Sequence, residues 1–343
     1  MKVNETFMLE TITEILQCDS PSGYCHEVMK IIERHADEAG FKFEKTQKGC
    51  GIITIPGKSN ERVIGLSAHV DTLGAMVRSI SSTGTLKFTL IGGPIAATLD
   101  GEYCKVVTRD GKLYTGTFLS TSPASHVFED ASTKARNPQT MEVRLDEVVK
   151  TKQDVEALGI ANGDYIFIDT KTTITPSGYL KSRFIDDKAS VGVLMTLMHH
   201  LKEQAITPSY TLKLFISVYE EVGHGSAYIP EDITEMIAVD MGCIGDDLTC
   251  TEHDVSICAK DSGGPYDYAM TSRLIELAKA NKLNYAVDIY PMYGSDVVAA
   301  LRGGNNICGA LIGPGVHASH GMERTHTEGL VNTLKLLNAY VTQ

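Results

Sequence analysis

The pattern of apolar and polar positions divides the chain into three parts. In the first part, up to about residue 71, two stretches with helical spacing precede two apolar strands. The second helix is predicted over His26–Ala39, with Gly40 as its C-terminal cap, and the strands over Gly51–Ile55 and Val63–Ala68. Val63–Ala68 is almost entirely apolar, which is typical of a parallel strand buried on both faces.

Between residues 72 and 164 the pattern changes to short alternating strands separated by turns. Lys105–Arg109 and Gly111–Phe118 alternate apolar and polar residues on either side of a turn at Asp110. We therefore predict that residues 72–164 form a β-rich domain inserted into a larger α/β domain, which consists of residues 1–71 and 165–343.

The third part returns to long apolar helices and buried strands. A helix is expected after Phe184, strands over Leu212–Val218 and Met236–Val239, and a closing helix over Thr327–Val341. The predicted fold class is α/β, with a mixed sheet flanked by helices and a β-barrel-like insert.

Charge and cysteine usage narrow the class of protein. The 343 residues include 43 Asp and Glu against 31 Lys and Arg, a net charge of −12, which argues against a nucleic-acid binder because such a protein needs a basic face. No apolar run approaches the ~20 residues that span a membrane, and residues 1–17 lack the apolar core of a secretory signal. The eight cysteines are scattered singly, which predicts reduced thiols and a cytoplasmic location.

Four apolar runs end in side chains that can bind metals or transfer protons. These side chains are His69 and Asp71, Asp186 and Asp187, Glu220 and Glu221, and Asp240. Because ligands bind where the carboxyl ends of the strands meet in open α/β sheets, we expect the four ends to converge on one site.

Such a set suits a pair of divalent ions. Two ions about 3.5–4 Å apart need a carboxylate that bridges them, and zinc accepts both imidazole nitrogen and carboxylate oxygen. Of the adjacent residues Glu220 and Glu221, one can bind metal while the other acts as general base. Asp71, two residues after His69, is placed to hold the second ring nitrogen of that histidine.

At these motifs the sequence resembles the M42 metallopeptidases, aminopeptidases that include glutamyl and tetrahedral aminopeptidases. The matching segments are Ala68-His-Val-Asp71, Asp186-Asp187-Lys188-Ala189, Glu220-Glu221-Val-Gly223, Ala238-Val-Asp240 and, in the insert, Thr108-Arg-Asp-Gly-Lys112. The resemblance implies a zinc-peptidase-like catalytic domain in which His69, Glu221 and Asp240 are metal ligands. It also implies that Asp186 bridges the metals, that Glu220 is the general base, and that the Asp186–Asp187 peptide bond is cis.

The last ligand expected from the resemblance is a histidine near the C-terminus. The family usually ends its last strand with an Arg-Tyr-x-His-Ser-type sequence, whereas this chain offers His317, His320 and His326. His320 falls within about one residue of the family's position when counted back from the closing helix, and we favour it over the other two. Elsewhere, His199 and His200 are expected to cap a helix, and as neighbours they point about 100° apart, which is poor geometry for sharing a metal.

The resemblance also implies cofactors and partners. We expect two divalent metal ions per subunit, with zinc as the first choice and cobalt or manganese as alternatives. The substrates are expected to be short peptides, and the chain to form a homo-oligomer through the insert, as in the tetrahedral dodecamers of the family, with neither nucleic acid nor membrane as a partner. Two alternatives stay open: a related dinuclear zinc deacylase or carboxypeptidase, and a catalytically silent oligomeric binding protein.

Overall fold

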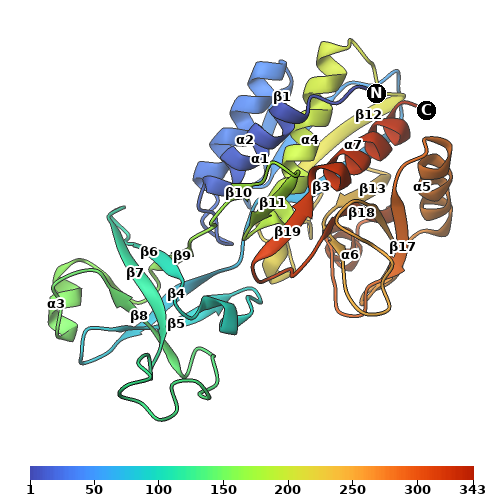
Figure 1. Ribbon diagram of the computed structural model, residues 1–343. Coiled ribbons are helices and arrows are strands. Elements are labelled where there is room, and N and C mark those ends of the chain that lie inside the picture. Colours follow the sequence, from blue (N-terminus) through green and yellow to red (C-terminus); the bar gives the residue numbers. More distant parts are fainter. The chain divides into compact units, whose positions relative to one another are not determined.

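Two units make up the computed structural model, which describes residues 1–343. The larger unit comprises Met1–Thr72 and Lys171–Gln343, and the smaller unit comprises Leu73–Thr170 (Figure 1). None of the helices has both the length and the apolar character needed to cross a lipid bilayer.

A ten-stranded mixed sheet forms the centre of the larger unit. Its main path runs β1-β2-β12-β3-β13-β18-β15-β16, with β14 beside β18 and β17 beside β15. The four central strands β12, β3, β13 and β18 are parallel, and β2 and β15 flank them in antiparallel orientation. The strands are β1 Lys42–Lys45, β2 Gly51–Ile55, β3 Ser59–His69, β12 Tyr210–Ser217, β13 Glu235–Val239, β14 Gly242–Cys243, β15 Val255–Asp261, β16 Gly264–Pro265, β17 Tyr285–Ile289 and β18 Cys308–Val316.

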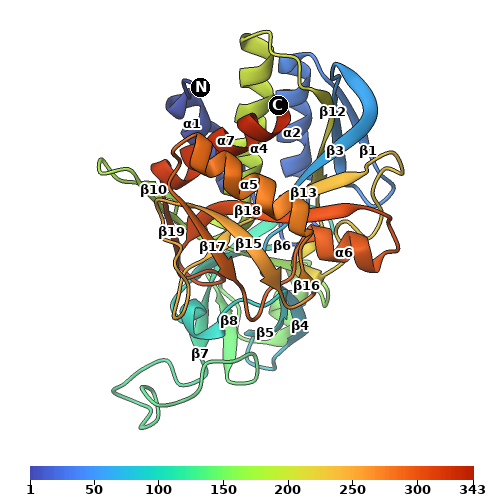
Figure 2. The same ribbon diagram turned by 90° about the vertical axis from the view of Figure 1, so that its right-hand side faces the viewer.

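Helices cover this sheet, as the apolar pattern predicts. The helices are α1 Glu5–Gln17, α2 His26–Ala39, α4 Ile185–Glu203, α5 Tyr268–Ala280, α6 Asp296–Arg302 and α7 Thr327–Val341. Helix α2 has its predicted bounds, and Gly40 caps it in the left-handed conformation with φ 73°. Helix α5 lies beside α7, which packs on β15 and β18, and α6 contacts β3, β13 and β18 (Figure 2). The predicted mixed sheet flanked by helices is therefore confirmed.

Helix α4 is the central helix of the unit. It contacts α1, α2 and α7 as well as β3 and β18, and it is buried along most of its length. Gly192 allows α1 to approach closely, because a Cβ atom there would collide with the side chain of Ile12. The packing of α4 therefore fixes Asp186 and Asp187, which lie at its N-terminal end with non-helical backbone angles, beside His69 at the end of β3.

A small three-stranded sheet corrects one expectation about the site. It has the order β10-β11-β19, with β10 Thr173–Ile174, β11 Tyr179–Ser182 and β19 Glu323–His326. The prediction that Asp186 follows a strand of the main sheet is wrong, because the strand before it, β11, ends at Ser182 and pairs with β10 and β19, and Asp186 itself lies at the start of α4. A short apolar run has the same appearance before a helix as inside a sheet, so the pattern alone does not separate the two cases.

The smaller unit is a closed β-barrel. Its strands follow the order β4-β5-β8-β7-β6-β9, and the unit also contains helix α3. The bounds are β4 Gly74–Ile80, β5 Leu86–Ile91, β6 Tyr103–Val107, β7 Leu113–Ser120, β8 Met141–Leu145, α3 Lys152–Ala157 and β9 Tyr165–Ile168. Phe88 and Phe118 are both fully buried and meet edge to face, with ring centroids 5.0 Å apart.

Candidate metal centre

The register of the parallel strands brings three of the predicted groups to one edge of the sheet. His69, the last residue of β3, pairs with Ser217 at the end of β12, and Glu220 and Glu221 follow shortly after. On the other side of β3, Ala238 of β13 pairs with Ser67, so that Asp240 lies level with His69 two residues later. These side chains therefore converge because their strands are neighbours and end at the same height.

Asp186 lies between two histidines that come from different elements. Its Oδ1 is 3.2 Å from Nε2 of His69, and its Oδ2 is 3.6 Å from Nε2 of His320. Nε2 of His320 is also 3.7 Å from Oε2 of Glu221. The two oxygens of Asp186 thus face two separate groups of potential ligands. The Asp186–Asp187 peptide bond is cis, as predicted.

Asp71 organises its surroundings in a way that differs from the prediction. Nδ1 of His69 is 2.9 Å from the backbone carbonyl of Asp71 and 3.6 Å from its Oδ1, so the main chain and not the carboxylate holds the ring. The carboxylate instead accepts hydrogen bonds from the backbone N–H groups of Glu220 (3.1 Å) and Glu221 (3.3 Å), and from the hydroxyl of Ser22 (2.6 Å). Asp71 therefore fixes His69 and the two glutamates at the same time.

The two glutamates have different positions at the site. Glu220 and Glu221 form one turn of 3-10 helix, Glu220–Val222, after β12. The side chain of Glu221 is 4% exposed and that of Glu220 is 16% exposed, with Oε2 of Glu220 3.7 Å from Nε2 of His69. Glu221 is thus the more enclosed group, and Glu220 retains more contact with solvent.

A cavity of about 270 Å³ opens beside these groups. Its lining residues are Asp186, Glu220, Glu221, Gly223, Asp240, Met292, Tyr293, Gly294 and His320. Gly294 belongs to the segment that leads into α6. It lines the cavity, while the next residue, Ser295, caps α6. The lining is rich in carboxylates and includes neither lysine nor arginine.

Burial and mutual repulsion dominate the electrostatics of the carboxylates. Burial raises the pKa of Glu220, Glu221 and Asp187 well above the ordinary range and that of Asp240 to about 7. Burial would also raise the pKa of Asp186, but hydrogen bonds from His320 and His69 hold it below its usual value. The site therefore brings together acidic groups whose ionised form a bound cation would stabilise.

The pKa of His69 is also raised, but by its acidic neighbours and not by burial. Burial by itself lowers the pKa of a histidine, yet Asp186, Glu220 and the other nearby carboxylates raise the pKa of His69 well above its ordinary value. The imidazole thus serves as the positive partner of these acids, a role that a bound cation would take over.

The donor set fits divalent metal ions. His69, Asp186 and Glu221 present ligand atoms within 4.8 Å of one another, as do His69, Asp187 and Asp240. Oε1 of Glu221 and Oδ1 of Asp187 are buried without a hydrogen-bond partner, and such orphaned oxygens are costly unless a further group binds them. Imidazole and carboxylate together suit zinc and similar ions.

The three candidate histidines differ in their distance from the other predicted ligands. His320 lies beside Asp186 and Glu221, whereas the main chain of His317 pairs with Arg324. His326 is the N-cap of α7, and its ring accepts a hydrogen bond from the backbone of Glu328. Of the three, only His320 is close to the other predicted ligands.

Two acidic residues at the site were not assigned a role from the sequence. Glu323 is 1% exposed, and its two carboxylate oxygens accept hydrogen bonds from the backbone N–H groups of Asp186 (3.0 Å) and His320 (2.9 Å). Burial and the Asp186 charge raise the pKa of Glu323 to about 8. Asp187 accepts a hydrogen bond from the backbone N–H of His69 at 3.2 Å. The sequence does carry one signal for Glu323: it is an acidic residue three positions after His320, a candidate metal ligand.

Comparisons with known proteins agree with this geometry. Residues 49–336 match the family model described as M42 glutamyl aminopeptidase. The chain is 46% identical to the putative aminopeptidase YhfE of Bacillus subtilis over 334 residues, which cover 97% of this chain and 96% of that protein.

Solved structures share the fold. The chain superposes on the aminopeptidase APDkam598 from Desulfurococcus kamchatkensis with a TM-score of 0.89 and 21% identity, covering 99% of this chain and 95% of that one. It superposes on the Pyrococcus horikoshii TET1 peptidase, which can assemble into a tetrahedron or a large octahedral shell, with a TM-score of 0.85 and 20% identity, covering 98% and 99% of the two chains.

Proposed function

The chain belongs to the M42 peptidase family, and we propose that it hydrolyses the N-terminal peptide bond of short peptides with two divalent metal ions at the carboxyl edge of its sheet. The observation that carries this proposal is Asp186, whose two oxygens face His69 on one side and His320 on the other. A carboxylate in that position suits a bridge between two metals.

We assign each remaining ligand by its neighbours. His69 and Asp240 would hold one ion together with Asp186, and Glu221 and His320 would hold the other, again together with Asp186. When bound, such ions polarise a carbonyl oxygen and lower the pKa of coordinated water toward neutrality. Zinc is the first candidate, with cobalt and manganese as alternatives, because all three accept this ligand set.

Glu220 is proposed as the general base. It lines the cavity, and its backbone is held by Asp71 while its carboxylate stays partly exposed. From that position it would accept a proton from the attacking water and deliver it to the leaving amine. Asp71 acts as a positioning residue, because its main chain orients His69 and its carboxylate holds the Glu220–Glu221 backbone.

The charge of the cavity supports removal of N-terminal rather than C-terminal residues. A carboxypeptidase or an amino-acid deacylase has to bind a free carboxylate, for which arginine and lysine are the usual partners. The cavity lining contains neither, and its acidic groups favour a positively charged α-amine. The proposed substrate class is therefore peptides with a free amino terminus.

The experiment is a hydrolysis screen over dipeptides with free or acetylated amino termini, using metal-depleted protein and the same protein reconstituted with zinc, cobalt or manganese. We expect cleavage only with metal and only of peptides with a free amino terminus. Cleavage of acetylated peptides, or preference for a free carboxyl terminus, would favour the deacylase or carboxypeptidase alternative. Metal binding without hydrolysis of any peptide would favour a silent binding protein.

Self-assembly through the barrel is proposed as the second part of the function. The Pyrococcus horikoshii TET1 peptidase assembles into closed shells, and the similarity covers 98% of this chain, so the barrel is included. In such an assembly the active sites would be reached only by short or unfolded peptides. Sedimentation analysis of the intact chain tests this proposal, which predicts a dodecamer and is contradicted by a monomer at all concentrations.

A further inference from the structure

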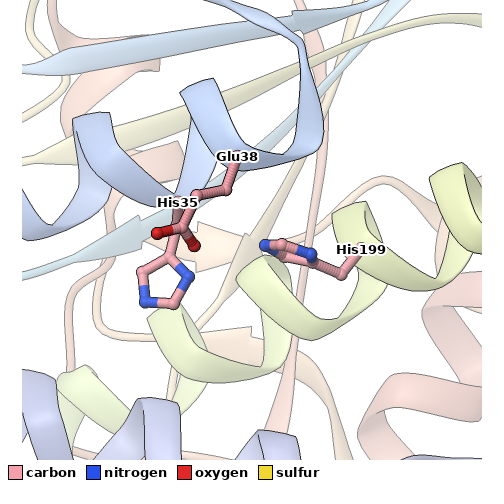
Figure 3. Close-up of side chains that lie close together, drawn as sticks. All are labelled: His35, Glu38 and His199. Atoms are coloured by element: carbon pink, nitrogen blue, oxygen red, sulfur yellow. The ribbon is translucent and has the colours of Figure 1, made fainter.

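Two histidines and a glutamate converge between α2 and α4, away from the metal centre. His35 and Glu38 lie three residues apart on α2, and His199 lies on α4 (Figure 3). Residues at this spacing on a helix share a face, so His35 and Glu38 both point toward α4. His199 lies thirteen positions after Asp186 along α4, which at about 1.5 Å per residue places it about 20 Å from the metal centre.

One ring nitrogen of each histidine in this cluster lacks the partner that a folded core would normally supply. His35 is 3% exposed, and its Nδ1 is buried without a hydrogen-bond partner. Nε2 of His199 is likewise buried and unpartnered. Unpaired buried polar atoms are uncommon in native proteins, and two of them in one small cluster indicate a missing ligand.

A neighbouring carboxylate prepares His35 for metal binding. Nε2 of His35 is 3.2 Å from Oε2 of Glu14 on α1, which places the ring proton on that nitrogen and leaves the lone pair on Nδ1. This carboxylate–histidine pairing is the usual outer-shell arrangement around histidines that bind metal. Burial also lowers the pKa of both His35 and His199, so both rings are neutral at neutral pH.

We propose that His35, Glu38 and His199 form a second, separate site for a transition-metal cation, with Zn²⁺ as the best match. One ligand atom from each residue lies within 4.8 Å of the others. Tetrahedral zinc requires ligand atoms about 3.3 Å apart, and the side chain of Glu38, which is about half exposed and pairs with Arg34 of the same helix, can supply much of the adjustment. Two imidazoles and a carboxylate leave the fourth position for water.

Charge and access are compatible with such a cation. Oε1 of Glu38 pairs with Arg34 at 3.0 Å, which leaves its other oxygen for the metal. The Glu38 side chain is about half exposed, so a dissolved ion can approach from that side, and His199 also lines a cavity of about 600 Å³ bounded by residues 1–7 and the end of α4. Phe7 packs against the His199 ring, with centroids 4.6 Å apart, and shields it on one side.

A second cluster, which also consists of two histidines and a glutamate, differs from the first in its hydrogen bonding. His253, His326 and Glu328 also lie within metal-binding distance of one another. There, however, each ring nitrogen has a partner: Nδ1 of His253 meets Glu328 and Nε2 meets Tyr179, while His326 bonds to the backbone of Ser177 and Glu328. That cluster is satisfied by hydrogen bonds, and the cluster on α2 and α4 is not.

The test is the zinc stoichiometry of the intact chain after the metal centre has been saturated. Wild-type protein should bind one zinc ion more per chain than E38Q, and its thermal midpoint should rise with zinc in a step that E38Q lacks, because the ion joins α2 to α4. Glu38 is exposed, so this variant should fold normally. D37N, at the exposed neighbouring position of α2, is the matched control and should behave as wild type.

Two further variants separate metal binding from aromatic packing. E14Q should weaken zinc binding by about 10–100-fold without removing the site, as loss of an outer-shell carboxylate does. H199Q should lose the additional zinc ion, whereas H200Q, at the neighbouring position, should keep it. Equal zinc stoichiometry in the wild type, E38Q and H199Q would overturn the proposal and leave the cluster as a packing contact around Phe7.

Discussion

Glu323 joins the two sides of the proposed metal centre, and its replacement offers a quantitative test of that role. In E323Q one carboxylate oxygen becomes an NH₂ group that faces a backbone N–H, either that of Asp186 or that of His320. At pH 9, above the pKa of about 8, Glu323 is ionised; a hydrogen bond to such a charged group contributes about 1.5–3 kcal/mol, and the donor left unpaired adds a further cost of about 1–3 kcal/mol. We expect the free energy of unfolding at that pH to fall by about 2.5–6 kcal/mol, the sum of these two contributions.

E323Q should also lower the metal affinity, and by more than the loss of folding stability alone would cause. Glu323 fixes the backbone of the bridging carboxylate and of the last histidine, so metal affinity should fall by about 10–100-fold. The assays are denaturant unfolding and metal titration by calorimetry. E328Q, an exposed change in the first turn of α7, is the control and should alter the free energy of unfolding by less than about 1 kcal/mol.

One result would refute this reasoning about Glu323. If E323Q kept wild-type stability and metal affinity, Glu323 would already be protonated in the folded protein, as its burial favours, and would not act as a double acceptor. In that case the positions of Asp186 and His320 would have to depend on other contacts.

Three further predictions concern the ligands, the metals and the barrel. H320Q should lose metal affinity and activity, whereas H317Q and H326Q should retain both, because only His320 lies near Asp186 and Glu221; metal analysis of the three purified variants decides this, and equal losses would contradict the assignment. Removal of metal with a chelator should abolish hydrolysis, and the added ion should restore it; activity that survives complete metal removal would exclude the mechanism. F118A should destabilise the barrel by about 3–5 kcal/mol, because the ring is fully buried; denaturant unfolding measures this, and a loss under about 1 kcal/mol would show that the site repacks.

Much of the fold could be predicted from the period of the apolar residues. The run before His69 and the run before Glu220 are both buried parallel strands, and α2 has its predicted bounds. These features are local, because a strand or helix that buries one face has apolar residues at a regular spacing within its own sequence. The proximity of His69, Glu220 and Asp240 then follows from a general rule about strand ends.

The parts that could not be predicted depend on contacts between distant segments. Asp186 was expected at a strand end but lies in the first turn of α4, because the preceding strand pairs with β19 instead of the main sheet. The hydrogen bonds of Glu323 and the approach of His199 to His35 likewise depend on tertiary packing, which has no period in the sequence. The backbone carbonyl of Asp71, which holds His69, carries no sequence signal at all.

The central claim is that Glu220 acts as the general base beside metals held by the other residues, and turnover by E220Q tests it most directly. The variant should keep the wild-type metal content, because Glu220 is not among the proposed ligands, and should lose about 10²–10⁴-fold in kcat, the contribution typical of a positioned base. Wild-type kcat in fully metal-loaded E220Q would contradict the claim.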